Sequence, residues 1–171
     1  PEEAEAVTPE VARNVFAALM GLFHWIVIDS PARIDDLVLP VFDRQPECLL
    51  VVTPELAAVR NAGQLLQLLR ELGYDTQKAR VVLNRWEPHS AVTPEVIERN
   101  LRLPVRVCIP ADCTAMQAAA AQGRPVLQDN AKSACGKALQ RLVHDLLGKG
   151  EAAPKRSVLS FIRNETKWAV S

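Results

Sequence analysis

Four short, predominantly apolar runs, each followed by a segment of helical length, constrain the fold of this chain more than any other feature. The runs cover residues 25–28, 48–52, 79–83 and 105–109. Strands that are apolar along most of their length and are separated by helices are typical of a parallel sheet covered on both faces. The sequence therefore predicts an α/β fold, namely a three-layer, doubly wound and mostly parallel sheet.

The segments between these runs carry helix signals. Thr-Pro-Glu occurs three times, beginning at Thr8, Thr53 and Thr93, and it is typical of a helix with threonine as N-cap and proline in its first turn. Gly73 and Gly123 follow helical segments and predict their ends. Two further helices are expected over residues 112–122 and 131–147. In the first helix, three-to-four spacing predicts an apolar stripe of Val11, Val15, Ala18, Leu19 and Leu22.

Composition excludes several classes of protein. Hydrophobic residues make up 49% and charged residues 23% of the 171 residues, as in globular rather than disordered chains. Lys and Arg together number 20, as do Asp and Glu, so no net charge attracts nucleic acid, and none is expected as a partner. No apolar run approaches the roughly 20 residues that span a bilayer. The four cysteines lack metal-ligand spacing, which favours reduced thiols in a cytoplasmic protein.

Polar or conformationally fixed residues follow each apolar run, where ligands of parallel sheets bind. An aspartate at a strand end, here Asp29, can hold a hydrated Mg²⁺ ion. The planar amide of Asn84 offers one acceptor and two donors, which suits the edge of an adenine. Each residue taken alone is equally consistent with an ordinary cap or turn. The positions concerned are Asp29, Thr53, Asn84, Arg85, Pro110 and Asp112.

Five stretches in this order resemble the ParA/MinD superfamily of deviant Walker ATPases. They are WIVIDSP, LLVVTPELAAVRNAGQLLQLLRELGY, ARVVLNR, LPVRVCIPAD and AAAAQGRPV. The second and third are most similar to the TadZ/CpaE branch, the localisation ATPases of tight-adherence (Flp-type) pilus machines. The resemblance covers roughly residues 15–147.

The resemblance implies roles for individual residues and for the intact protein. Asp29 matches the Walker B aspartate that binds magnesium, and Asn84, with Arg85 beside it, matches the asparagine that recognises adenine. Pro110 and Asp112 match the loop that closes over the base. The implied cofactors are ATP and Mg²⁺, and the implied assembly is an ATP-dependent homodimer.

The phosphate-binding loop of that superfamily, KGGxGKT, is absent from this sequence, which contains only 7 glycines. The resemblance places that loop upstream of the Walker B strand. We therefore expect residues 1–148 to be the C-terminal part of an ATPase domain that is truncated at its N-terminus. Alone, such a chain should bind ATP weakly or not at all and should be inactive as an ATPase. Its incomplete sheet should leave an exposed edge that favours association of chains.

Residues 149–171 are expected to form a hinge and a short basic amphipathic helix. This helix either packs on its own domain or a partner, or contacts a membrane peripherally through residues 155–171. The resemblance implies pilus-assembly proteins and the secretion ATPase as partners, and a cytoplasmic location at the inner membrane or cell pole. The alternatives are a non-hydrolysing scaffold or another positioning ATPase for the division site, flagellar number or plasmid partition.

Overall fold

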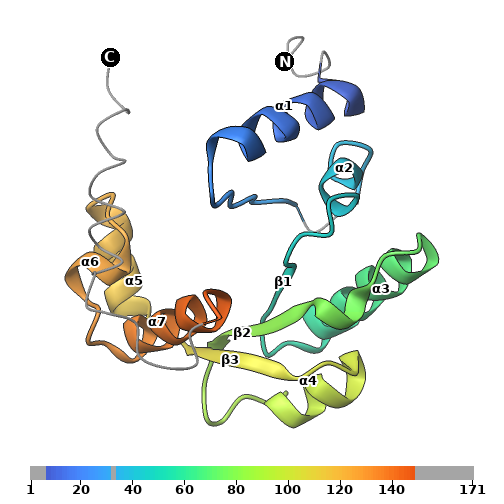
Figure 1. Cartoon of the computed structure of the whole chain (residues 1–171). Helices are drawn as coiled ribbons and strands as arrows, with labels where there is room; N and C mark the ends of the chain where they lie inside the picture. Colours follow the sequence, from blue (N-terminus) through green and yellow to red (C-terminus); the bar gives the residue numbers. More distant parts are fainter. Residues whose placement is uncertain (1–6, 32–33, 149–171) are drawn as a thin grey trace.

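Three parallel strands form the sheet at the centre of the fold (Figure 1), in the order β1-β2-β3. The computed structural model describes residues 7–31 and 34–148. Strand β1 spans Leu49–Val52, β2 spans Arg80–Trp86 and β3 spans Val105–Pro110. The predicted α/β class with a parallel sheet is therefore confirmed.

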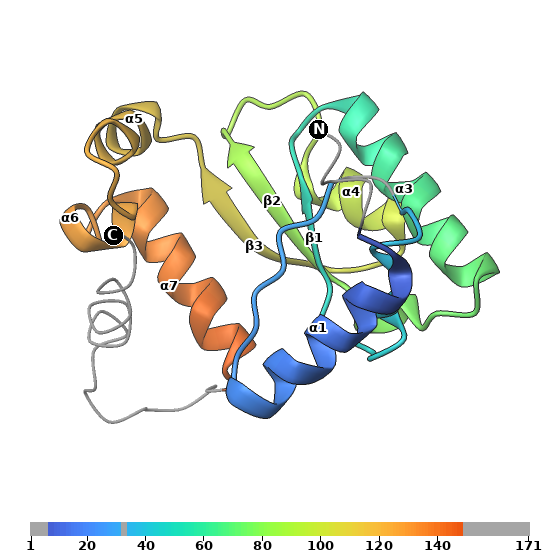
Figure 2. The ribbon, with the colours of Figure 1, turned by 90° about the horizontal axis from the view of Figure 1, so that it is seen from above.

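Helices cover both faces of this sheet. Figure 2 shows α3 and α4 together on one side of the strands and α7 on the other. This arrangement follows from parallel strands, which must be joined by crossover segments that pack on the sheet. The helices are α1 (Pro9–Leu22), α2 (Leu39–Phe42), α3 (Leu56–Glu71), the 3-10 helix η2 (Thr76–Lys78), α4 (Pro94–Leu101), α5 (Cys113–Ala121), α6 (Val126–Asp129) and α7 (Ala134–Leu146).

The three Thr-Pro-Glu signals have different outcomes. Thr8 caps α1 as predicted, because its hydroxyl accepts a hydrogen bond from the amide of Val11 at 3.3 Å. Thr93 is the N-cap of α4, but its side chain accepts no capping bond; its hydroxyl bonds to Glu95 and lowers the pKa of that carboxyl. The third prediction is wrong: the amide of Glu55 bonds to the carbonyl of Thr53 at 2.8 Å, and α3 begins two residues later than expected.

Two apolar clusters hold the helices to the sheet. On one face, Leu50, Val81 and Leu83 pack with buried residues of α3 and α4, including Leu66 and Ile97. On the other face, a smaller cluster joins strands β2 and β3 to α7. Its buried members are Val82, Val107, Ile109, Cys135 and Ala138. Both faces of β2 are therefore buried, which explains why its sequence is nearly continuously apolar.

The predicted strand over residues 25–28 is wrong for this structure. That segment has no regular secondary structure, and Trp25, Val27 and Ile28 are exposed to 59%, 95% and 42%. A strand requires a neighbouring backbone with which to exchange hydrogen bonds, and neither edge of the sheet pairs with this segment. An apolar sequence is therefore not sufficient for a strand unless such a neighbour is present.

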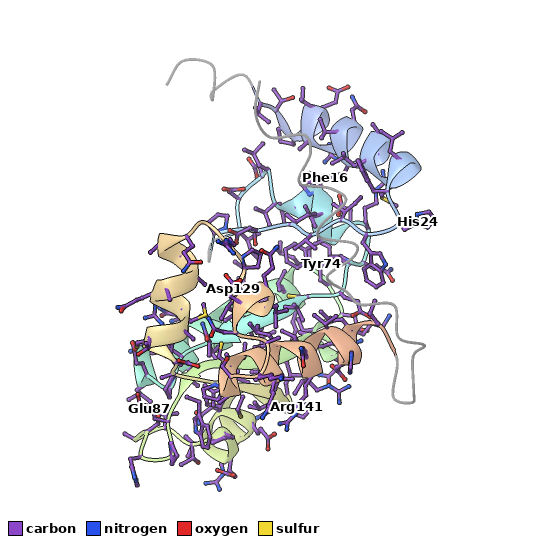
Figure 3. The ribbon with its side chains drawn as sticks, turned by 90° about the vertical axis from the view of Figure 1, so that its left-hand side faces the viewer. Phe16, His24, Tyr74, Glu87, Asp129 and Arg141 are labelled. Carbon is purple, nitrogen blue, oxygen red and sulfur yellow. The ribbon has the colours of Figure 1, made fainter. Side chains whose placement is uncertain are left out.

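Helix α1 also packs differently from its predicted stripe. Val11, Val15 and Leu22 are exposed to 43%, 49% and 74%, and only Ala12 is fully buried. The helix contacts α2 rather than the sheet. Figure 3 shows Phe16 of α1 on one side of α2 and Tyr74 on the other. The apolar stripe of α1 is therefore largely exposed among the described residues.

Arg80 fastens the C-terminal end of α7 to the start of the strands. Its guanidinium donates to the backbone oxygen of Asp145 at 2.9 Å and to its carboxylate at 2.7 Å. The same guanidinium bonds to Glu47 at 3.0 Å, and Arg106 reaches Asp145 at 3.3 Å.

The predicted hinge and helix of residues 149–171 lie outside the described residues. Over the described part, no helix has the length and apolar character to cross a membrane.

Candidate functional site

The carboxyl ends of β2 and β3 meet at one edge of the sheet. Trp86 pairs with Pro110 across the two strands, and the amide of Ala111 donates to the carbonyl of Trp86 at 3.0 Å. These contacts bring two of the predicted positions, Asn84 with Arg85 and Pro110 with Asp112, to the same edge. Sequence reasoning missed the bond between Ala111 and Trp86, because backbone groups carry no residue-specific signal.

Asn84 and Arg85 lie where the register of β2 against β3 is interrupted. The backbone of Arg85 has a φ of 55°, which is unusual for a residue other than glycine. The side-chain oxygen of Asn84 accepts a hydrogen bond from the amide of Arg85 at 2.9 Å. The amide group of Asn84 therefore keeps both donors for other contacts, while the guanidinium of Arg85 is exposed beside it.

Pro110 ends β3, and Asp112 begins α5 two residues later. The carboxylate of Asp112 accepts a hydrogen bond from the amide of Ala115 at 3.2 Å, so this aspartate is the N-cap of the helix. Pro110 and Asp112 are both half-buried. The loop at residues 110–112 is therefore fixed at both ends, by a strand pairing before it and by a helix cap after it.

Asp29 is not brought to this edge by any contact in the described structure. It is exposed and follows the unpaired segment 25–28. Among the described residues, no hydrogen bond or ion pair involves Asp29. The structure thus brings Asn84, Arg85, Pro110 and Asp112 to one edge. It leaves Asp29 apart, because the segment before it pairs with no strand among the described residues.

Two of the cysteines near this edge, Cys108 and Cys135, are protected thiols. Burial, followed by the negative charges of Glu95 and Glu98, raises the pKa of Cys108. Burial and the Asp112 carboxylate raise the pKa of Cys135. The thiolate is the nucleophilic form of cysteine, so Cys108 and Cys135 are poor nucleophiles. All four cysteines are free, as predicted, and Cys113, which follows Asp112 at this edge, is the exposed one.

The hydrogen-bond donors at this edge suit the base of a nucleotide better than its phosphates. Asn84, Arg85 and the fixed 110–112 loop offer donors and a rigid surface that suit a base. Over the described residues, no group of three or more His, Cys, Asp or Glu side chains could hold a metal ion. Mg²⁺ bound to nucleotides commonly uses one or two carboxylates together with the phosphates. Asp29 could supply such a carboxylate only where another segment binds the phosphates.

No protein-family model matches the chain. The septum site-determining protein MinD of Thermotoga maritima is 30% identical over an alignment of 151 residues, which covers 85% of this chain and 55% of that protein. MinD of Escherichia coli K12 is 30% identical over 177 residues, covering 96% of this chain and 63% of the relative.

A solved ParA family ATPase from Chlorobium tepidum superposes with a TM-score of 0.76 and 30% identity, over 82% of this chain and 60% of that structure. The chain therefore spans less than two thirds of the length of each of these three proteins. The shared architecture is that of P-loop NTPases of the ParA/MinD type, as the sequence predicted.

Proposed function

We propose that this chain, which is homologous to ATPases of the ParA/MinD family, is the base-binding half of an ATP site in a longer positioning ATPase. The observation that carries this proposal is the meeting of Asn84 and Arg85 with the 110–112 loop at the carboxyl edge of the sheet. Ligands of open parallel sheets bind at that edge.

In this proposal each residue has a defined task. Asn84 donates from its amide to the edge of adenine, and Arg85 lies beside the base. Pro110 and Asp112 hold the loop that closes over it. Asp29 binds the hydrated Mg²⁺ that accompanies ATP in the intact protein. A solved MinD from Pyrococcus horikoshii is described as complexed with Mg-ADP, which supports this cofactor pair.

In this proposal the phosphate-binding half of the site comes from polypeptide outside residues 1–171. A nucleotide's phosphates are bound by backbone amides and a lysine of the kind that a glycine-rich loop supplies. The sequence of residues 1–171 contains no such loop. The edge of β1 is unpaired in the described structure, and Leu49 and Val51 are exposed to 37% and 57%. A strand bearing the loop would pair at this edge, would give residues 25–28 a neighbour, and would bring Asp29 to the nucleotide.

For the cellular role we propose a TadZ/CpaE-like localisation ATPase of a tight-adherence pilus. The sequence stretches VVTPELAAVRNAGQLLQLLRELGY and VVLNR support this branch. The intact protein would form an ATP-dependent homodimer and bind the secretion ATPase and other pilus-assembly proteins. It would act in the cytoplasm, at the inner membrane or the cell pole, and residues 155–171 would contact a membrane or a partner.

A second candidate role is positioning of the division site. It is favoured by the relatives found, since the MinD proteins of two distant bacteria are each 30% identical to the chain. A solved MinC:MinD complex from Aquifex aeolicus identifies the kind of partner this role would involve. Deletion of the gene distinguishes the roles: loss of surface pili with normal septa supports the pilus role, and misplaced septa support the division role.

The test of the biochemical proposal is the longer protein. Its upstream sequence should contain a glycine-rich loop with lysine, and the purified protein should hydrolyse ATP. Asp29→Asn should abolish hydrolysis while leaving the fold intact by circular dichroism. A degenerate upstream loop, with ATP bound but not hydrolysed, would instead identify a non-hydrolysing scaffold. Absence of ATP binding by the longer protein would refute the proposal.

A further inference from the structure

A cleft of about 310 Å³ lies between α3 and α4, away from the candidate nucleotide site. Helix α3 begins after β1 ends, so its last turn lies toward the opposite, amino edge of the sheet. The floor of the cleft is formed by Leu66 and Leu101, which are almost fully buried. Its walls carry polar side chains: Gln67, Arg70, Asn100 and Arg102.

Gly63 borders this cleft at a position where helix packing does not require glycine. It lies inside α3, where glycine costs roughly 0.5–1 kcal/mol relative to alanine. A Cβ atom at this position would meet only the Cδ2 atom of Leu101, at 3.8 Å. That distance is an ordinary contact, so alanine would fit. The missing methyl group leaves the cleft open instead.

Arg102 borders the same cleft with a backbone that disfavours arginine. It is the C-cap of α4, with φ 56° and ψ 34° in the left-handed region. Glycine or asparagine is usual at a left-handed helix end. Strained backbone of this kind often accompanies function. Two positions on one cleft, Gly63 and Arg102, therefore carry residues that are unfavourable for folding.

The guanidinium of Arg70 is held in place on the facing helix. Its Nε atom donates to the hydroxyl of Thr76 at 2.8 Å, and the side chain of Thr76 is buried. This bond leaves the two terminal nitrogens of Arg70 for other partners. Within residues 7–31 and 34–148, neither Arg70 nor Arg102 forms an ion pair with a carboxylate.

The amides on the walls are partly engaged. Gln67 donates to Glu71 at 2.9 Å, and Asn100 donates to the carbonyl of Val96 at 2.7 Å. Among the described residues, the terminal guanidinium nitrogens of Arg70 and Arg102, both of which line the cleft, form no hydrogen bond. The fork of N–H donors on a guanidinium group matches the geometry of carboxylate and phosphate oxygens.

We propose that this cleft is a binding site for an oxyanion, a carboxylate or a phosphate group, that bridges Arg70 and Arg102. The absence of a side chain at Gly63 keeps the site open. The left-handed backbone of Arg102, although unfavourable for arginine, places its positive charge at the cleft. The site is separate from the nucleotide edge and does not depend on the proposed function. The anion can come from a small phosphate ligand or from an acidic side chain of a partner.

The experiment follows the backbone amide resonances of Gly63 and Arg102 by NMR in the 171-residue chain. The probes are inorganic phosphate and a short glutamate-rich peptide, each titrated at constant ionic strength against chloride. Saturable shifts in the wild type are expected with at least one probe. Stronger binding of phosphate identifies a small ligand, and stronger binding of the peptide identifies an acidic partner.

Three variants separate a built site from general charge attraction. Arg102→Gly and Arg70→Gln should each weaken binding by roughly tenfold, the worth of one charge-assisted hydrogen bond. Arg99→Gln removes the same charge from an exposed position of α4 outside the cleft and should leave binding unchanged. Equal loss in Arg99→Gln and Arg102→Gly, or shifts that never saturate with either probe, would overturn the proposal.

Stability gives an independent readout. Arg102→Gly and Gly63→Ala should each raise the thermal midpoint of unfolding, because each removes an unfavourable residue, while each weakens anion binding. A lower midpoint in both variants would show that these residues serve the fold, and the proposal would fail.

Discussion

The carbonyl of Trp86 and the amide of Ala111 share a hydrogen bond of 3.0 Å that ties the carboxyl end of β2 to the loop after β3. Because of this bond, Asn84 and Arg85 lie beside the loop that contains Pro110 and Asp112. Trp86 itself is half-buried and packs against the main apolar cluster, so it anchors this edge rather than offering a free stacking surface.

Asp112 should matter first as a helix cap. Asp112→Ala removes the acceptor for the amide of Ala115 and should lower the free energy of unfolding by about 1 kcal/mol. Asp112→Asn keeps an acceptor oxygen and should remain within a few tenths of wild type. Urea unfolding measures both changes. An equal loss in the two variants would indicate that the charge, and not the cap, stabilises this turn.

Gly136 is required by the close packing of α7 on the loop before it. A Cβ atom at this position would clash with the backbone oxygen of Asn130 and would lie 2.8 Å from that of Ala131. Backbone atoms cannot move aside cheaply, so Gly136→Ala should destabilise the protein by about 1–3 kcal/mol.

The matched control is Gly63→Ala, the same substitution in another helix with space around it. It should stabilise the protein by roughly 0.5–1 kcal/mol. Urea unfolding of the two variants should therefore give shifts of opposite sign. A stable Gly136→Ala variant would contradict the placement of α7 against residues 130 and 131.

Tyr74 should titrate at an unusually high pH. Its hydroxyl donates to the carboxylate of Asp43 at 2.8 Å, and this bond is the main cause that raises the pKa of the phenol. The folded pKa lies above the unfolded one, so the bond stabilises the fold below the unfolded pKa. That stabilisation is lost as pH rises through the folded pKa.

The chain has a single tyrosine, so phenolate absorbance reports on Tyr74 alone. The titration midpoint of the wild type should exceed the ordinary value of about 10. Asp43→Ala should bring it back toward that value. If both proteins titrate at the same pH, the Tyr74–Asp43 contact does not persist in solution.

The four thiols should differ in reactivity. Cys113 is exposed, whereas burial raises the pKa of Cys48, Cys108 and Cys135. At mildly alkaline pH, a disulfide reagent should therefore modify one thiol rapidly and three slowly. Cys113→Ser should remove the rapid phase alone. Rapid modification of two or more thiols in that variant would show that the apolar clusters open readily.

Sequence patterns predicted most of what depends on local signals. Gly73 and Gly123 both have left-handed backbones, as helix-ending glycines should, and the apolar runs of β2 and β3 form parallel strands. Segment 25–28 failed because a strand is a property of two backbones, and its neighbour is not among the described residues. The left-handed turns at Arg85 and Arg102 were also not foreseen, since arginine carries no signal for that conformation.

The sequence also predicted some features of the candidate site and missed others. Asn84, Arg85, Pro110 and Asp112 could be placed together from the rule that parallel strands end at one edge. The sequence did not predict that Asp112 caps α5 or that Asn84 accepts a hydrogen bond from the amide of Arg85. Both side chains could equally have faced solvent, so these contacts are known only from the structure. Asp29 could be identified as a strand-end carboxylate, but its position depends on a strand pairing that is not made within residues 7–31 and 34–148.

The most direct test of the account is a calorimetric titration of Mg-ATP and of adenosine into the 171-residue chain. If the chain holds only the base-binding half of the site, the phosphates add nothing. ATP and adenosine should then bind equally weakly or not measurably, and the longer protein with an upstream phosphate-binding loop should bind Mg-ATP tightly. Tight binding of ATP, but not of adenosine, by the 171-residue chain alone would contradict the account.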